Sequence, residues 1–265
     1  MIEIKSFAKS DVGKVRQNNE DFYGEFKIDS EHMVFIVADG MGGHNAGEVA
    51  SRLAVLTFFE SYKKYVDDLK EPEKAIELAF HDANRKVFEE GAGKESQHGM
   101  GTTLSVLVLK GKEAFLGHVG DSRIYLIRED ECKKLTRDHS LVGKMRENGI
   151  ISEEEARVHP RRNILYLTLG VKESINPQIS SRIEIKEGDI FVLCSDGLSN
   201  MVSDEEIKII SINNPPKKAV ERMIEIARER GAPDNVTVEV IKIEKKEDET
   251  TKKIKIKKKR RFGIF

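Results

Sequence analysis

Three apolar segments of this chain end in an aspartate beside a glycine, and this repeated pattern constrains the fold more than any other feature. The segments stop at Asp39-Gly40, Gly120-Asp121 and Asp196-Gly197. Each apolar run has the length of a buried strand, which would hold the acid rigidly at its end. Because glycine lets a backbone approach a ligand closely, acids at such ends can converge above a sheet. One such pair is typical of an ordinary turn, but three in one chain favour a common site.

The charge of the chain is unevenly distributed, which excludes some classes of protein. Over 265 residues the formal net charge is −1, yet residues 252–261 carry eight positive charges and no negative ones, so the remainder carries −9. A nucleic-acid-binding body usually presents a basic face, and we therefore expect no nucleic-acid partner. Two cysteines, Cys132 and Cys194, exclude a disulfide scaffold. With no apolar run of about 18 residues, we expect a protein of the reducing cytoplasm.

The order of the predicted elements indicates an α+β fold. Apolar runs predict strands, and apolar residues at helical spacing predict helices. We expect a strand, two helices, a block of strands, short helical pieces, further strands, two helices and a last strand, at residues 33–38, 45–68, 72–90, 101–136, 138–170, 178–195, 203–211, 216–230 and 236–241. We interpret the strands within 101–136 as one antiparallel meander. Segregated helices and strands favour two packed sheets with helices on their outer faces.

Four carboxylates are candidates for one site. Glu20 and Asp234 join Asp39 and Asp196 in this set. Like charges held close together repel, so they either protonate or bind cations. Two divalent ions would bring four positive charges against the four negative ones. Oxygen ligands suit Mg²⁺ or Mn²⁺ rather than Zn²⁺, and the histidines show no spacing typical of a zinc motif.

Arg16 lies four residues before Glu20 and adds a phosphate-binding group to the acids. By itself this arginine would be interpreted as a surface ion-pair residue. Its guanidinium, however, offers a fork that matches two phosphate oxygens. A two-metal centre stabilises in-line displacement at phosphorus, with the ions about 3.5–4 Å apart. The combination predicts hydrolysis of a phosphomonoester. Neither cysteine has an arginine six residues later, which excludes a thiol phosphatase.

Seven short segments carry a resemblance that extends over residues 12–237. They read Val12-Gly13-Lys14-Val15-Arg16-Gln17-Asn18-Asn19-Glu20-Asp21, Val37-Ala38-Asp39-Gly40-Met41-Gly42-Gly43-His44, Gly99-Met100-Gly101-Thr102-Thr103, Val119-Gly120-Asp121-Ser122-Arg123-Ile124-Tyr125, Thr136-Arg137-Asp138-His139-Ser140, Cys194-Ser195-Asp196-Gly197-Leu198 and Asp234-Asn235-Val236-Thr237. One segment alone is a weak signal, but seven in this order are specific. The chain resembles the metal-dependent protein serine/threonine phosphatases of type 2C, in their compact bacterial form.

The resemblance implies a fold and a metal-ligand set. The implied fold is a central antiparallel β-sandwich flanked by helices on both faces, in four layers, as a single catalytic domain over residues 1–244. Two Mn²⁺ or Mg²⁺ ions are implied in a cleft at one end. Asp39 would bridge them and the Gly40 carbonyl would be a ligand. Glu20 would serve one ion, and Asp196 and Asp234 the other.

The resemblance also implies roles for residues around the metals. Arg16 would hold the substrate phosphate, and Asp21 would orient the attacking water. Asp121, with Asp196, would bind a third and weaker ion. Residues 140–170 would form the flap of the family, which modulates access and substrate choice.

Several motif residues are not assigned to the chemistry. Many eukaryotic members have a histidine directly after the aspartate-glycine pair, proposed as the general acid, whereas this chain has Met41. His44 follows three residues later, and we favour the opening of a helix there. We expect structural roles for Gly101-Thr102-Thr103, and for Arg123 and Asp138 in polar networks.

The expected activity is hydrolysis of phosphoserine and phosphothreonine in proteins, by direct attack of a water that two divalent metals activate. The alternative is a catalytically silent adaptor of the same fold that binds phosphoproteins. By resemblance, the partners would be a cognate serine/threonine kinase and its substrates, and we expect a monomer.

The basic segment at residues 252–261 has three interpretations. It is a solvated tail, a short strand, or the cytoplasmic flank of a membrane helix, which would place the enzyme at the inner membrane face. We therefore treat residues 245–265 as a tail outside the catalytic domain.

Overall fold

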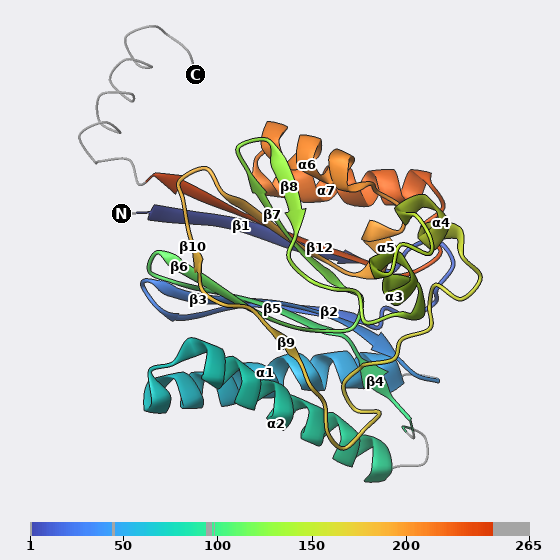
Figure 1. The fold of residues 1–265 in the computed structure, drawn as a ribbon, viewed down its shortest axis with the longest axis horizontal. Helices are drawn as coiled ribbons and strands as arrows, with labels where there is room; N and C mark the ends of the chain where they lie inside the picture. Colours follow the sequence, from blue (N-terminus) through green and yellow to red (C-terminus); the bar gives the residue numbers. More distant parts are fainter. Residues whose placement is uncertain (1, 44–45, 94–96, 98, 246–265) are drawn as a thin grey trace, which may run out of the picture.

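The computed structural model describes residues 2–43, 46–93, 97 and 99–245, which contain a sandwich of two antiparallel sheets (Figure 1). One sheet has the order β1–β12–β11–β7–β8, with bounds Ile2–Asp11, Val236–Lys245, Ile190–Cys194, Arg123–Arg128 and Glu131–Lys134. The other has the order β10–β6–β5–β3–β2, with bounds Ile183–Glu184, Glu113–Val119, Leu104–Lys110, His32–Met41 and Asp21–Asp29. Two short strands, β4 (Gly101–Thr102) and β9 (Gln178–Ile179), pair with β3 and β6.

Four long helices cover the outer faces of the sandwich. On the β3 sheet lie α1 (Ala46–Leu69) and α2 (Pro72–Gly93) (Figure 1). On the β12 sheet lie α6 (Asp204–Asn213) and α7 (Pro216–Glu229). The predicted α+β class and its four layers are therefore confirmed.

The apolar run of β3 is continuous because both of its faces are covered. Phe35 and Val37 lie in the core between the two sheets. Val34, Ile36 and Ala38 alternate with them and pack in the core under α1 and α2. The strand is thus buried on both sides along the path to Asp39.

The predicted antiparallel meander over 101–136 is wrong at the connection between β6 and β7. β5 and β6 pair antiparallel, but the chain then crosses to the other sheet, where β7 pairs with β11 and β8. Gly120 at the crossing has φ +110°, a conformation that residues with a side chain rarely adopt. An apolar strand has the same pattern whether its successor pairs beside it or faces it across the sandwich, so sequence alone did not separate the two.

Two strands, β1 and β2, were not predicted. β1 pairs with β12 along its whole length, and β2 pairs with β3. Polar residues interrupt both segments and hide their pattern; β1, for example, reads IEIKSFAKSD.

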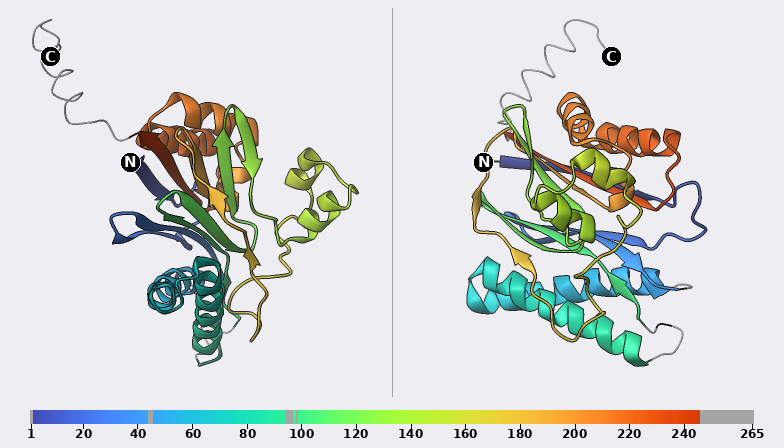
Figure 2. Two further views of the ribbon diagram at one scale, coloured as in Figure 1. Left: turned by 60° about the vertical axis from the view of Figure 1, so that its left-hand side comes forward. Right: turned by 45° about the vertical axis from the view of Figure 1, so that its right-hand side comes forward.

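Residues 140–170 contain two short helices, as predicted, and extend to one side of the sandwich (Figure 2). These are α3 (Leu141–Glu147) and α4 (Glu153–Val158), capped by the hydroxyls of Ser140 and Ser152. His44 and the basic segment 252–261 lie outside the described residues. In the part of the chain that the structure does describe, no helix is both long and apolar enough to cross a bilayer.

Phe58 offers a test of the core under α1. Its ring is fully buried and lies 5.2 Å from the Phe80 ring, centroid to centroid. We expect Phe58→Ala to lower the free energy of unfolding by about 3–5 kcal/mol, because a cavity replaces the ring. Leu56→Ala is the matched control, since Leu56 is 41% exposed on the same helix; it should change stability by less than about 0.5 kcal/mol. Urea denaturation of both variants measures the difference, and equal losses would contradict the assigned core.

Candidate metal and phosphate site

The acids predicted to converge do so at one end of the sandwich. They line a cleft of about 180 Å³, which we call the acidic cleft. Its walls include seven residues singled out from the sequence: Arg16, Glu20, Asp39, Gly40, Asp121, Asp196 and Asp234. Asp21 is the predicted site residue that does not line the cleft; it lies buried beside it.

The backbone of Asp39 is held in place by two threonines. Its N–H donates to the Thr103 hydroxyl at 2.9 Å, and its carbonyl accepts from the Thr103 N–H at 2.9 Å. The same carbonyl accepts from the Thr102 hydroxyl at 2.9 Å. The structural role expected for Gly101-Thr102-Thr103 is confirmed, and these bonds fix the acid at the strand end.

Two glycines let separate segments meet at the cleft. A Cβ on Gly40 would lie 2.0 Å from the Gly47 carbonyl oxygen and 2.6 Å from that of Glu20. A Cβ on Gly197 would lie 1.9 Å from the carbonyl oxygen of Asn235. Neither position has room for a side chain. This explains why glycine follows Asp39 and Asp196.

Burial, and after it the charge of neighbouring acids, raises the pKa values of two key acids of the cleft, Asp39 and Asp196. Burial, together with the charges of Asp21 and Asp196, raises the pKa of Asp39 well above its usual range. Burial also raises the pKa of Asp196 to about 6, with the charge of Asp234 as the next cause. The Oδ1 atom of Asp196 is buried without a hydrogen-bond partner among the described residues. The cleft therefore holds more negative charge than the protein itself neutralises.

The donors in the acidic cleft fit hard divalent ions in their chemistry. Carboxylate oxygens and the Gly40 carbonyl are the ligands that Mg²⁺ and Mn²⁺ prefer. As the described side chains stand, no three His, Cys, Asp or Glu are grouped tightly enough to hold an ion. Ion binding would therefore draw the carboxylates together, which mutual repulsion opposes in the absence of cations.

Arg16 contacts an acid in this structure. Its Nη2 lies 2.9 Å from Asp234 Oδ2, and half of its side chain is exposed at the mouth of the cleft. Arg16 thus lies close to the acids, as predicted. Its side chain contacts Asp234 and is otherwise partly exposed to solvent.

Asp21 is anchored by two hydroxyl groups that sequence reasoning did not single out. Ser195 and Thr237 each donate to Asp21 Oδ2 at 2.7 Å. Burial raises the pKa of Asp21 to about 7, although these two hydrogen bonds lower it. The only sequence signal for the two residues was their position inside the matching segments.

Asn235 is a third residue whose role was missed. Its side-chain oxygen accepts from the Glu20 N–H at 2.8 Å, and its amide donates to the carbonyls of Val12 and Asn18 at 3.0 and 2.9 Å. It therefore clamps the loop that carries Arg16 and Glu20 onto the start of β12.

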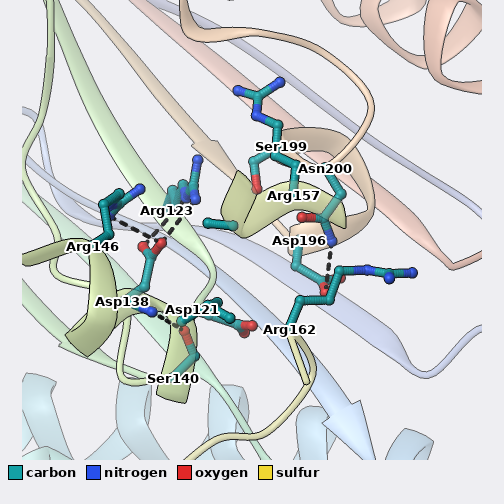
Figure 3. A pocket seen from close by; sticks show the side chains of 13 residues that line it. Asp121, Arg123, Asp138, Ser140, Arg146, Arg157, Arg162, Asp196, Ser199 and Asn200 are labelled. Carbon is teal, nitrogen blue, oxygen red and sulfur yellow. Dashed lines mark hydrogen bonds and ion pairs between the residues drawn. The ribbon is translucent and has the colours of Figure 1, made fainter. Parts of the chain in front are cut away.

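Arg123 and Asp138 form the polar network that was expected. Arg123 Nη2 lies 2.8 Å from Asp138 Oδ2, and Lys134 Nζ lies 3.0 Å from Oδ1. Burial alone would raise the pKa of Asp138, but these cations hold it well below its usual range. Figure 3 shows Arg123 and Asp138 turned toward each other, on the side of Asp121 away from Asp196, and this pairing indicates a structural role.

Comparison with known proteins places this geometry in a family. Residues 13–238 match the family described as "Protein phosphatase 2C". The chain is 36% identical over 242 residues to protein phosphatase PhpP of Streptococcus pneumoniae, covering 91% of this chain and 98% of that protein.

Solved structures show the same fold. The serine/threonine phosphatase PstP/Ppp of Mycobacterium tuberculosis has a TM-score of 0.81 at 35% identity, over 92% of this chain and all of that one. The catalytic domain of PstP in complex with two manganese ions has a TM-score of 0.79 at 33% identity, over 92% of this chain and 100% of that one. The chain therefore belongs to the protein phosphatase 2C family of metal-dependent serine/threonine phosphatases.

Proposed function

We propose that the acidic cleft is where this phosphatase hydrolyses phosphoserine and phosphothreonine in proteins. In this proposal Glu20, Asp39, the Gly40 carbonyl, Asp196 and Asp234 hold two divalent ions. The observation that carries the proposal is that these oxygens, from opposite ends of the chain, line one cleft.

Mn²⁺ or Mg²⁺ bound there would lower the pKa of a water and neutralise charge on the phosphate oxygens. The Arg16 guanidinium binds two oxygens of the substrate phosphate at the mouth of the cleft. To do so it gives up its contact with Asp234. Asp21, which is buried beside the cleft, would orient the attacking water, and its Oδ1 has no partner among the described residues. Asp121 would hold a third, weaker ion together with Asp196, since both acids line the cleft.

The leaving oxygen needs a proton. The residue directly after Asp39-Gly40 does not supply one in this chain. Met41 lines the cleft and carries no transferable proton. We therefore assign protonation of the leaving alkoxide to a solvent water in the cleft.

A silent phosphoprotein-binding adaptor is the competing function. Glu20, Asp39, Asp196 and Asp234 all line the cleft, and loss of one of these acids would have favoured the adaptor. Metal-dependent turnover separates the two.

The domain division, the cellular partners and the location are also proposals. Residues 1–244 are proposed as one catalytic domain, with 140–170 as its flap, and the enzyme as a cytoplasmic monomer that opposes a cognate serine/threonine kinase. The basic segment 252–261 would bring it to the inner membrane face by attraction to anionic lipid. Sedimentation with phosphatidylserine vesicles tests this attachment, and failure to sediment at low salt would refute it.

Removal of a proposed metal ligand should abolish catalysis. With Mn²⁺, the wild type should hydrolyse p-nitrophenyl phosphate, and Asp39→Asn and Asp196→Asn should each lower kcat/KM by at least about 100-fold. Asp68→Asn is the control, since Asp68 is an exposed acid on α1, remote from the cleft. Full activity in the double variant would refute the site, whereas an inactive wild type would favour the adaptor.

Arg16 should act mainly on substrate binding. We expect Arg16→Ala to raise KM about ten-fold, because a charge-assisted hydrogen bond to phosphate is lost, and Arg16→Lys to be less severe. Steady-state kinetics on a phosphopeptide measure both. Arg222→Ala, an exposed arginine of α7, serves as control; an unchanged KM in Arg16→Ala contradicts the phosphate role.

The stability of the metal-free protein gives a readout independent of activity. In chelator, Asp39→Asn should melt at a higher temperature than the wild type, since it removes one of the crowded acids. Mn²⁺ at about 100 times its Kd should stabilise the wild type by about 2.7 kcal/mol and the variant much less. Thermal unfolding with and without Mn²⁺ decides, and equal stabilisation of both proteins would count against Asp39 as a ligand.

A further inference from the structure

A second pocket adjoins the acidic cleft beside the flap, and we call it the flap pocket (Figure 3). Asp121 and Asp196 line both spaces. The flap pocket differs from the cleft because four arginines, one of them Arg162, also line it. Arginine side chains therefore stand next to the proposed reaction centre, together with the carboxylates of Asp121, Asp138 and Asp196.

Three of the four arginines are engaged by acids. Arg123 and Arg146 lie 2.8 and 3.4 Å from Asp138 Oδ2, and Figure 3 shows both turned toward that carboxylate. Arg157 lies 3.7 Å from Asp204 Oδ1, on α6. Their charges are thus at least partly compensated within the protein.

Arg162 differs from the other three arginines. Its backbone N–H donates to the His159 carbonyl at 3.1 Å, but its guanidinium has no ion-pair or hydrogen-bond partner among the described residues. The residue is only partly exposed. An anion at this guanidinium would form forked, charge-assisted hydrogen bonds without first displacing an acid of the described residues.

The position of Arg162 relates it to the substrate. The next residues along the chain, Asn163 and Leu165, line the acidic cleft. The segment 162–165 therefore forms a wall shared by the two spaces, with Arg162 on the flap-pocket side. A phosphoserine held in the cleft would bring its flanking residues past this wall.

We propose that Arg162 binds a second anionic group of the phosphoprotein substrate, either a carboxylate or a second phosphate near the phosphoresidue that is hydrolysed. This proposal rests on the proposed function of the cleft. It defines a substrate class: phosphoproteins with an acidic or doubly phosphorylated sequence around the site. Arginine suits both groups because its fork matches either carboxylate or phosphate oxygens.

A peptide series tests this specificity. All peptides contain the same phosphoserine, with glutamine at the three positions on either side of it. Each member of the series replaces one of these glutamines by glutamate. Further members have phosphothreonine at one of these positions instead. We expect the wild type with Mn²⁺ to prefer glutamate at one or two positions by about two- to five-fold in kcat/KM, as for a partly exposed ion pair. Arg162→Gln should remove this preference and Arg162→Lys should retain part of it. A preference for the second phosphate without one for glutamate assigns the site to phosphate.

Arg161→Gln is the matched control, because Arg161 is the exposed neighbour and does not line the flap pocket. This variant should keep the wild-type ratio of glutamate to glutamine peptides. The same preference in Arg162→Gln as in the wild type, or a wild type that prefers neither glutamate nor the second phosphate, would overturn the proposal. Failure of the cleft itself is separate, since it would abolish wild-type turnover of p-nitrophenyl phosphate, which has no flanking residues.

Discussion

Repulsion among the carboxylates of the acidic cleft is the interaction on which the rest of the structure depends. Burial and, after it, the charges of neighbouring acids raise the pKa values of Asp39 and Asp196, and these side chains would move apart if their backbones were free to move. The fold prevents this by placing them where rigid elements end: Asp39 within the last residues of β3, and Asp196 at the junction of β11 with α5 (Asp196–Ser199). The repulsion between carboxylates is therefore concentrated in the acidic cleft. There it creates affinity for cations.

Close backbone contacts hold this arrangement together. Gly40 and Gly197 let neighbouring main chains approach to distances that exclude a side chain. Thr102 and Thr103 bind both polar groups of the Asp39 backbone, and Asn235 joins the Glu20 loop to β12. Hydrogen bonds that are buried in this way are costly to break, so they counteract the strain of the crowded charges.

The buried strands and the acids at their ends could be predicted from the sequence. Asp39 and Asp196 follow continuous apolar runs, and such runs reveal buried strands without knowledge of their partners. The crossing at Gly120 could not be predicted, because an apolar strand does not encode which sheet its successor joins. The contacts of Asp21 with Ser195 and Thr237 depend on segments that meet only in the folded molecule. The same holds for Arg162, because the absence of a partner for its guanidinium among the described residues depends on what surrounds it in the fold.

The clamp made by Asn235 has a consequence for protein synthesis. The acidic cleft joins a loop from the beginning of the chain to residues that the ribosome adds among the last of the described part, and β12 is inserted between β1 and β11 rather than added at an edge. Contacts between such distant segments form late, after most of the chain has emerged. A nascent molecule thus lacks Asp234 and the support of its amino-terminal loop, and a product truncated before β12 would have neither the sheet nor the chemistry.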